Sequence, residues 1–268
     1  MLEEQIRGHM ITLYDRGTHQ PLLWTHLIPA TLEGRALHNV QNAMFAATIA
    51  FSMGVKIENI RQGLRTFDTT FFQAPGRLNV FDKLPFKVIL DYGHNAAAMK
   101  AMADLVRRLD VNGRRIAVIS APGDRRDEDI AEIARQAAAA FDQLILRTDD
   151  DPRGRDVDAV PNLMARALRE ADVPASRFQI IPEESAAIDA ALAMGRPGDL
   201  LVIFGDNLTR SWKQIIYFSG GEHAPPELVT PPPVDDVLVP AHATEPDVSR
   251  ITVIADERGV RLARETDD

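Results

Sequence analysis

Residues 87–95, KVILDYGHN, run from an apolar strand directly into side chains that can form hydrogen bonds. The letters VIL are typical of a strand that is buried on both faces of a sheet. The strand ends at Asp91, and His94 and Asn95 follow within four residues. Parallel α/β sheets bind their ligands beyond the carboxyl ends of the strands. The stretch therefore predicts a fold class and one edge of a binding site together.

The alternation of apolar strands and amphipathic helices continues along the chain. Strands are predicted at 115–120, 143–147, 178–181 and 199–204, and helices at 96–109, 127–140, 160–171 and 184–194. This order predicts an α/β fold with a mainly parallel sheet and right-handed crossovers. The loops that follow the strands are rich in polar residues, so we expect a cleft formed by 91–95, 120–127, 147–155 and 204–210.

The segment before this alternation has a different pattern. Two β-rich stretches, 9–14 and 20–28, flank the turn Asp15-Arg16-Gly17, and helices are predicted at 40–53 and 57–66. A lone hairpin is only marginally stable in water. These strands therefore need a sheet that the sequence does not obviously supply, and an exposed edge there would require a partner chain.

The last 50 residues, 219–268, are acidic and rich in proline. They carry 11 Asp and Glu against 4 Lys and Arg, and 219–250 holds 7 of the 17 prolines. We expect an extended or disordered linker, followed by a small hairpin within 251–263. The sequence thus predicts three parts: 1–75, 76–218 and this tail.

Composition excludes several functional classes. The chain has no cysteine, so it has no disulfide framework, thiolate zinc site or cysteine nucleophile. No apolar run reaches the roughly 18 residues of a membrane span, and the N-terminus has no apolar signal core. The formal net charge is -9, and no extended basic patch for nucleic acid is visible. We expect a cytoplasmic protein that binds neither nucleic acid nor membrane.

Two short stretches before residue 80 allow two interpretations each. In HNVQN (38–42), Asn39 could cap a helix, or an amide such as that of Asn42 could meet the edge of a nucleobase. In PGR (75–77), Arg77 could be a solvated side chain after a Pro-Gly turn, or it could bind phosphate.

Two charged loops follow the next strands. In GDRRDED (123–129), Asp127 could cap a helix, but the adjacent Asp124, Arg125 and Arg126 also fit contacts to a nucleotide or an acidic substrate. In DDDPRGR (149–155), the charges could pair with one another within a solvated loop. Alternatively, Asp150, Asp151 and Arg153 could bind a cationic or zwitterionic amino acid, because carboxylates suit an ammonium or guanidinium group.

Several catalytic patterns are missing from the sequence. There is no GxxxxGK[ST] phosphate loop, no GxGxxG and no HExxH, and no Ser-His-Asp arrangement is visible. We therefore predict no complete catalytic set and no metal site within this chain.

The order HNVQN, PGR, DYGHN, GDRRDED and DDDPR resembles the distal half of the Mur ligase superfamily. Within that superfamily, residues 21–218 are similar to the cyanophycin synthetases, while the tail is not. The resemblance implies the end of a Mur-ligase central domain at 1–75 and a Rossmann-like C-terminal domain at 76–218. One departure is Ala96, where those enzymes usually have proline after DYGHN.

The resemblance also implies an activity and roles for individual residues. A complete enzyme of this type uses ATP with Mg²⁺ to join L-arginine to an aspartate polymer, by an isopeptide bond formed through an acyl phosphate. Asn42 would meet the adenine, Arg77 the phosphates and Asp91 the ribose, with His94 and Asn95 beside the nucleotide. Asp150, Asp151 and Arg153 would bind the incoming amino acid.

The same resemblance implies that the phosphate loop and an ATP-grasp module belong to a complete protein and are missing here. We therefore expect negligible ATP turnover by this chain alone. It would work with a separate N-terminal half or in a self-oligomer. The alternative is a non-catalytic remnant that binds a nucleotide or arginine.

Overall fold

The computed structural model describes residues 1–5, 8–219, 251–256 and 259–264. The described residues up to 219 belong to one compact unit. Strands β10 (Ile251–Asp256) and β11 (Gly259–Arg264) pair antiparallel in a second unit, which confirms the predicted hairpin near the C-terminus. The predicted linker, 219–250, lies outside the described residues except for Ser219.

The N-terminal strands form a sheet of their own. β1 (Leu2–Gln5), β2 (Gly8–Asp15) and β3 (Thr18–Trp24) pair antiparallel in that order. The prediction that these strands lack a sheet was therefore wrong. Residues 2–5, LEEQ, gave no strand signal because they lack apolar alternation. The predicted strand end at Ile28 was also wrong, since two 3₁₀ turns follow β3, at Thr25–Leu27 and Pro29–Thr31.

Two helices cover this sheet, α1 (Leu37–Ser52) and α2 (Ile57–Thr66). They enclose a small apolar core with the strands, formed by Ile11, Leu13, Leu22, Leu23, Ile28, Ala43, Ala47 and Ile60. α2 has the predicted bounds, and Gly54, at φ +80°, follows α1 as predicted. α1 begins earlier than predicted, so Asn39 lies inside the helix and is not its cap. Its side chain donates instead to the carbonyl oxygen of Ala30, at 2.7 Å.

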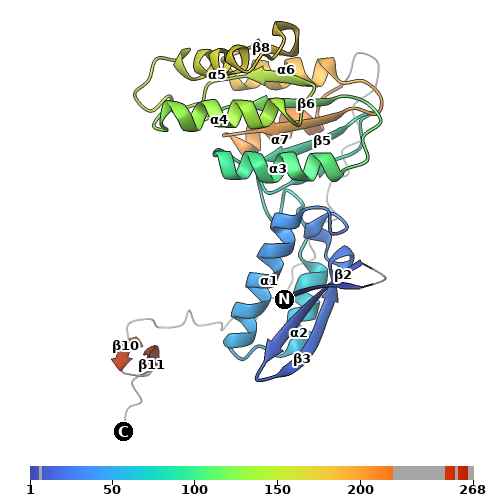
Figure 1. Cartoon of the computed structure of the whole chain (residues 1–268), viewed down its shortest axis with the longest axis vertical. Coiled ribbons are helices and arrows are strands. Elements are labelled where there is room, and N and C mark those ends of the chain that lie inside the picture. The colour runs from blue at the N-terminus through green and yellow to red at the C-terminus, as the bar shows by residue number, and fades with distance from the viewer. Residues whose placement is uncertain (6–7, 220–250, 257–258, 265–268) are drawn as a thin grey trace, which may run out of the picture. The chain divides into compact units, whose positions relative to one another are not determined.

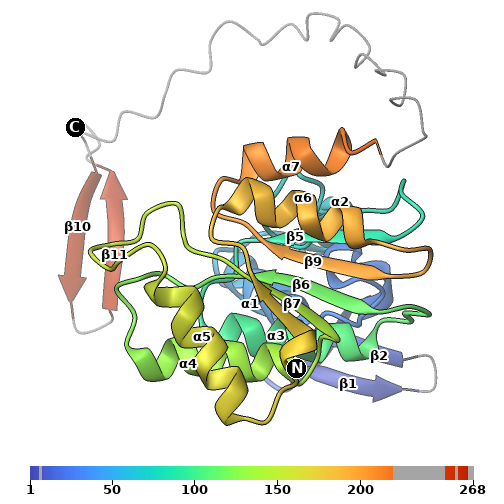
Figure 2. The same ribbon diagram turned by 90° about the horizontal axis from the view of Figure 1, so that it is seen from above.

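The second sheet has six strands in the order β4-β5-β9-β6-β7-β8 (Figures 1 and 2). Their bounds are β4 Asn79–Phe81, β5 Lys87–Asp91, β6 Arg115–Ile119, β7 Gln143–Leu146, β8 Phe178–Ile180 and β9 Leu200–Phe204. All pairs are parallel except β4 with β5, as the sequence predicts for 87–204. The edge strand β4 was not predicted, because three residues are too few for a periodic signal.

Helices cover both faces of this sheet (Figure 2). α3 (Ala96–Arg108), α4 (Asp127–Ala138) and α5 (Ala159–Glu170) lie on one face, and α6 (Glu184–Met194) and α7 (Leu208–Ile216) lie on the other. The helices on each face pack against the sheet through a separate apolar core. Asp127 lies in the first turn of α4 and makes no cap bond, so its prediction as the N-cap was wrong; the N-cap is Arg126. α7 was not predicted.

The N-terminal segment and the six-stranded sheet are in contact within the first unit. Ala36 and Leu78 are buried in the core on the α3 side of the sheet. Arg35 donates to Asp110 at 2.8 Å, just beyond α3. Among the described residues, none of the helices combines the length and the apolar character that a membrane crossing requires.

Candidate functional site

Asp91, at the carboxyl end of β5, connects two turns of the backbone. Its Oδ2 accepts from the amide of Leu78 at 3.0 Å, and its Oδ1 accepts from the amide of Gly93 at 2.8 Å. Burial raises the pKa of Asp91 above the ordinary value, while these two amides and the charges of Arg77 and His38 act in the opposite direction. Asp91 is thus an acceptor held between the turn 76–79 and the loop 91–95.

Arg77 stands on the first of these turns. The residues on either side of it have left-handed backbone conformations, with φ +68° at Gly76 and +52° at Leu78. Leu78 is buried, whereas Arg77 is exposed. The turn is also held from the carboxyl end of β5, because the amide of Tyr92 donates to the carbonyl oxygen of Gly76 at 2.9 Å. This local geometry leaves the side chain of Arg77 exposed at the surface.

Asn42 and Arg77 line the same cavity, which lies between α1 and α2 and has a volume of about 530 Å³. Its walls are mainly apolar and include Ile28, Ala43, Ala46, Ala47, Ala50, Ile60, Gly63, Leu64 and Phe67. Four alanines along α1 and a glycine in α2 leave the space open. A cavity with apolar walls and a few polar groups is the usual form of a site for a small molecule.

The amide of Asn42 is oriented by its neighbour on the helix. Its Nδ2 donates to Oδ1 of Asn39 at 3.1 Å, and Asn39 in turn donates to the carbonyl of Ala30. This chain of amides leaves the carbonyl oxygen of Asn42 available to a ligand. His38 lies on the same helix, where burial lowers the pKa of its imidazole and the charge of Asp91 acts to raise it.

His94 and Asn95 lie in the loop after β5 and make local contacts. Nδ1 of His94 is 3.1 Å from the carbonyl oxygen of Tyr92, and the two rings meet edge to face at 5.1 Å. Oδ1 of Asn95 accepts from the amide of Ala98 at 2.8 Å, so this side chain caps α3. Among the predicted nucleotide residues, Asn42 and Arg77 line one cavity, Asp91 lies within range of the charge of Arg77, and Asn95 has a structural contact.

A second polar cluster lies at the carboxyl ends of β7 and β9, around the fully buried Arg147. Its guanidinium donates to the carbonyl oxygens of Thr148 and Phe204 at 2.8 and 2.7 Å. It also pairs with Asp206 at 3.0 Å and Glu184 at 3.3 Å. Sequence reasoning missed this cluster. The available signal was an arginine directly after the apolar run QLIL, since a buried charge requires a partner.

Asp149 belongs to the same cluster and is also buried. Its Oδ1 accepts from the hydroxyl of Ser120 at 2.6 Å. Burial, together with the nearby charge of Asp206, raises the pKa of Asp149 to about 6. Burial also acts to raise the pKa of Asp206, but the hydrogen bond and charge of Arg147 outweigh it, so the pKa of Asp206 is lowered. The pKa values of the two aspartates are thus shifted in opposite directions, upward for Asp149 and downward for Asp206.

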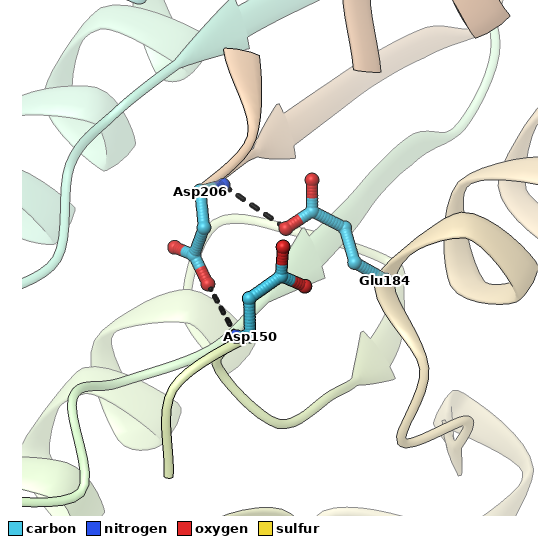
Figure 3. Close-up of side chains that lie close together, drawn as sticks. All are labelled: Asp150, Glu184 and Asp206. Atoms are coloured by element: carbon cyan, nitrogen blue, oxygen red, sulfur yellow. Dashed lines mark hydrogen bonds between the residues drawn. The ribbon is translucent and has the colours of Figure 1, made fainter. Parts of the chain in front are cut away.

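Three carboxylates converge at the open side of this cluster, from Asp150, Glu184 and Asp206 (Figure 3). The amide of Asp150 donates to Asp206 at 3.1 Å, and the amide of Asp206 donates to Glu184 at 3.0 Å. One oxygen from each carboxylate lies within 4.8 Å of the others. Arg147 and Arg210 already pair with these groups, as carboxylates readily pair with guanidinium groups.

The two charged loops predicted from the sequence are joined to each other. Arg153 pairs with Asp124 at 3.2 Å, and its amide donates to Oδ1 of Asp151. Arg155 donates to the carbonyl oxygen of Arg125 at 2.7 Å and to the carboxylate of Asp127 at 2.8 Å. The ion pairs of Arg153 and Arg155 therefore run between the two loops, and not within the loop 149–155 as one of the two interpretations of the sequence had it.

The remaining predicted loop residue is exposed. Arg126 pairs with Asp129 in the first turn of α4, through two contacts of 2.9 Å. This hydrogen bond raises the pKa of Arg126. Of the predicted acceptor residues, only Asp150 joins the buried cluster, through Asp206 and Arg210.

Comparison of the sequence with known proteins identifies a matching family and several relatives. Residues 76–207 match the family described as Mur ligase, glutamate ligase domain. A cyanophycin synthetase from Nostoc sp. is 38% identical over 217 residues, which is 78% of this chain and 24% of that protein. A second cyanophycin synthetase, from Geminocystis herdmanii, is 40% identical over 188 residues, or 70% of this chain and 21% of that protein.

A diaminopimelate-adding muramyl ligase from Solibacter usitatus is more distant. It is 29% identical over 168 residues, covering 62% of this chain and 32% of that protein. The chain thus spans about a quarter of the length of the cyanophycin synthetases that it matches.

Solved structures share the fold at lower identity. A folylpolyglutamate synthase from Mycobacterium tuberculosis, complexed with ADP and AMPPCP, gives a TM-score of 0.56 at 23% identity and covers 83% of this chain and 47% of that one. A D-alanyl-D-alanine-adding muramyl ligase from Acinetobacter baumannii gives 0.51 at 20% identity, with 80% and 42% covered. The chain therefore contains a Mur ligase C-terminal domain at residues 76–207 and is a relative of the cyanophycin synthetases.

Proposed function

We propose that this chain supplies the nucleotide-contacting and acceptor-binding surfaces of an ATP-dependent ligase that joins arginine to the side-chain carboxylates of an aspartate polymer. The observation that carries the proposal is the placement of two polar sites in one unit. One comprises the cavity lined by Asn42 and Arg77, with Asp91 within range of the charge of Arg77, and the other combines Asp150, Glu184 and Asp206. The similarity to cyanophycin synthetases supports this choice of reaction.

At the first site, the carbonyl oxygen of Asn42 would accept a hydrogen bond from the adenine amino group, with the apolar cavity beside the base. Arg77 would contact the phosphates, because a guanidinium pairs well with phosphate oxygens. Asp91 would accept from a ribose hydroxyl with the lone pairs that its two amide bonds leave free. His94 would lie beside the nucleotide.

At the second site, the carboxylates would hold the cationic groups of the incoming arginine. The cluster around Arg147 contains four acidic groups, from Asp149, Asp150, Glu184 and Asp206, against two guanidiniums. A further cation would offset part of this excess of negative charge. Asp151 and Arg153, in the adjacent loop, would contact the amino acid where it enters.

Mg²⁺ would accompany ATP and neutralise charge on the transferred phosphoryl group. The carboxylates of the acidic cluster pair with two guanidiniums, and we assign Mg²⁺ to the phosphates and to no side chain of the described residues. Phosphoryl transfer further requires groups that hold the β- and γ-phosphates, and the sequence contains no phosphate loop. We therefore propose that catalysis, which we place in the cytoplasm, needs a phosphate-binding segment that these 268 residues do not contain.

The second candidate function is a non-catalytic binding module for a nucleotide or for arginine. The observation that favours it is the same lack of a phosphate loop in the sequence. The two candidates differ in turnover, because only the ligase forms ADP from ATP when an aspartate polymer and arginine are both present.

The test of both candidates begins with calorimetric titration of the purified chain with ADP and with L-arginine. The proposal expects both to bind, and it expects Asp150→Asn to weaken arginine about tenfold while the exposed Asp158→Asn leaves it unchanged. ADP formation is then measured with polymer and arginine, with and without the N-terminal part of a cyanophycin synthetase. Turnover only in the mixture supports the ligase, binding without turnover in either supports the module, and no binding of either ligand refutes both.

A further inference from the structure

Asn79, the first residue of β4, is fully buried and holds the turn that carries Arg77. Its Oδ1 accepts from the amide of Gly76 at 2.6 Å. Its Nδ2 donates to the carbonyl oxygens of Thr69 and Ala74, both at 2.8 Å. One side chain therefore closes the whole segment 69–76 through three backbone contacts.

The backbone that Asn79 holds is strained. Leu78 has φ +52°, in the left-handed region that side chains other than glycine seldom adopt. Such a conformation persists only where the surroundings fix it, and it is typical of functional sites. Here the surroundings are Asn79 on one side and Asp91, which accepts from the amide of Leu78, on the other.

The consequence of the strain is the position of Arg77. Its neighbours Gly76 and Leu78 are both buried, so Arg77 is the one residue of 76–79 that reaches the surface. Its side chain lines the cavity between α1 and α2. The amide of Asn79 does not line that cavity, so it can affect a ligand there only through the turn.

We propose that Asn79 is a positioning residue for Arg77, which fixes the guanidinium at the rim of the cavity where the phosphates of a bound nucleotide would lie. The proposal rests on the proposed function of the first site. An amide is required because the contacts combine one acceptor and two donors. Aspartate would keep the acceptor and lose both donors, and alanine would lose all three contacts.

A neighbouring aromatic pair allows the turn to be observed directly. Phe71, within the segment that Asn79 closes, stacks on Trp212 of α7 with ring centroids 5.0 Å apart and planes at 4°. The other tryptophan, Trp24, lies in β3. In a Trp24→Phe background, the fluorescence of Trp212 therefore reports on this segment and not on the N-terminal sheet.

The experiment compares the affinities for ADP and for adenosine by calorimetry. Arg77→Gln is expected to weaken ADP about tenfold and to leave adenosine unchanged, because only ADP carries phosphates. Asn79→Ala should give the same pattern, and the double variant should show no further loss. Asn59→Ala, which removes an amide from another wall of the cavity, should leave the ratio of the two affinities unchanged.

Two controls keep the proposal testable. If Asn79→Ala does not fold, Asn79→Asp replaces it, since aspartate keeps the contact to Gly76. If the wild-type chain binds no ADP, the proposed function fails, and the positioning role is judged by amide hydrogen exchange. Asn79→Ala should then speed exchange at Gly76 and Leu78 at least tenfold, with a changed Trp212 emission and no change within β6. An unchanged ADP-to-adenosine ratio, or unchanged exchange at the turn, would overturn it.

Discussion

Arg210 binds Asp150 through both carboxylate oxygens, with its Nη2 at 2.9 and 2.8 Å from them. The same nitrogen is 3.5 Å from Oε1 of the fully buried Glu184. The hydrogen bond that Arg210 donates to Asp150 raises the pKa of Arg210, although burial opposes the shift. A guanidinium from the chain itself thus occupies part of the acidic cluster that we assign to the substrate arginine.

We expect Arg210→Gln to increase the affinity for L-arginine, by about tenfold, because the substrate would no longer compete with a resident guanidinium for Asp150. Calorimetric titration with L-arginine checks this. Arg166→Gln, which removes another arginine from a surface pair with Glu170, serves as the control and should change nothing. Weaker binding in Arg210→Gln would instead make Arg210 itself a contact of the ligand.

Arg147→Met should destabilise the fold by about 3–5 kcal/mol, because it leaves Glu184 and Asp206 without their buried cation. The measurement is the urea dependence of far-ultraviolet circular dichroism. Arg107→Met, in an exposed contact with Asp104, should shift the midpoint little. Equal midpoints for the two variants would show that the buried cluster contributes no more than a surface pair.

The pKa of Asp149 gives stability a distinct pH dependence. It is raised from 3.8 to about 6 in the folded chain, so the folded state binds a proton that the unfolded state has already released. This contribution to stability is present below about pH 4 and is lost as the pH rises through about 6. Asp149→Asn should flatten the pH dependence in that window, as measured by urea unfolding at a series of pH values. A slope that Asp149→Asn leaves unaltered would assign the effect to other groups.

Gly76→Ala should destabilise the chain by about 1–3 kcal/mol. The added Cβ would lie 2.6 Å from Cδ1 of Leu208, on a backbone with φ +68°. Gly54→Ala is a matched control, since it has φ +80° but nothing within 4 Å of the added atom. The difference in thermal unfolding between the two variants isolates the steric clash. The double variant Gly76→Ala/Leu208→Ala should recover part of the loss.

Asn42→Ala should weaken ADP binding and reduce the preference for ADP over GDP, because the carbonyl oxygen of Asn42 is available to an amino group and GDP has a carbonyl oxygen at that ring position. Competition titrations with the two nucleotides check this. A preference for ADP that survives the substitution would remove Asn42 from base recognition.

Much of the fold could be predicted because its signals are local. The α/β alternation from 87 to 204 follows from apolar periods, and α2, β5 and α6 have the predicted bounds. Strand β1 and helix α7 could not be predicted in the same way. The residues LEEQ of β1 carry no alternation, and α7 begins inside a loop that looked polar.

The candidate sites likewise divide into residues with a local sequence signal and residues without one. Asn42, Arg77 and Asp91 were predicted from motifs; Asn42 and Arg77 line one cavity and Asp91 lies within range of the charge of Arg77, and their roles stay predictions. Arg147, Glu184 and Asp206 were missed because they lie far apart in the sequence, and their ion pairs form only when the carboxyl ends of β7 and β9 and the first turn of α6 come together in the fold. Asn79 was missed because its role depends on hydrogen bonds to three backbone groups, which the sequence pattern does not reveal.

Helix α7 contacts both sites through different side chains. Leu208 packs on Gly76, and Trp212 stacks on Phe71, next to the turn of Arg77. Arg210 and Ser211, on the same helix, contact Asp150 and Glu184. Redesign of the proposed acceptor pocket for a different amino acid is therefore restricted by the first site. Libraries should vary position 210 and keep Leu208, Ser211 and Trp212, because these three side chains hold the helix in place.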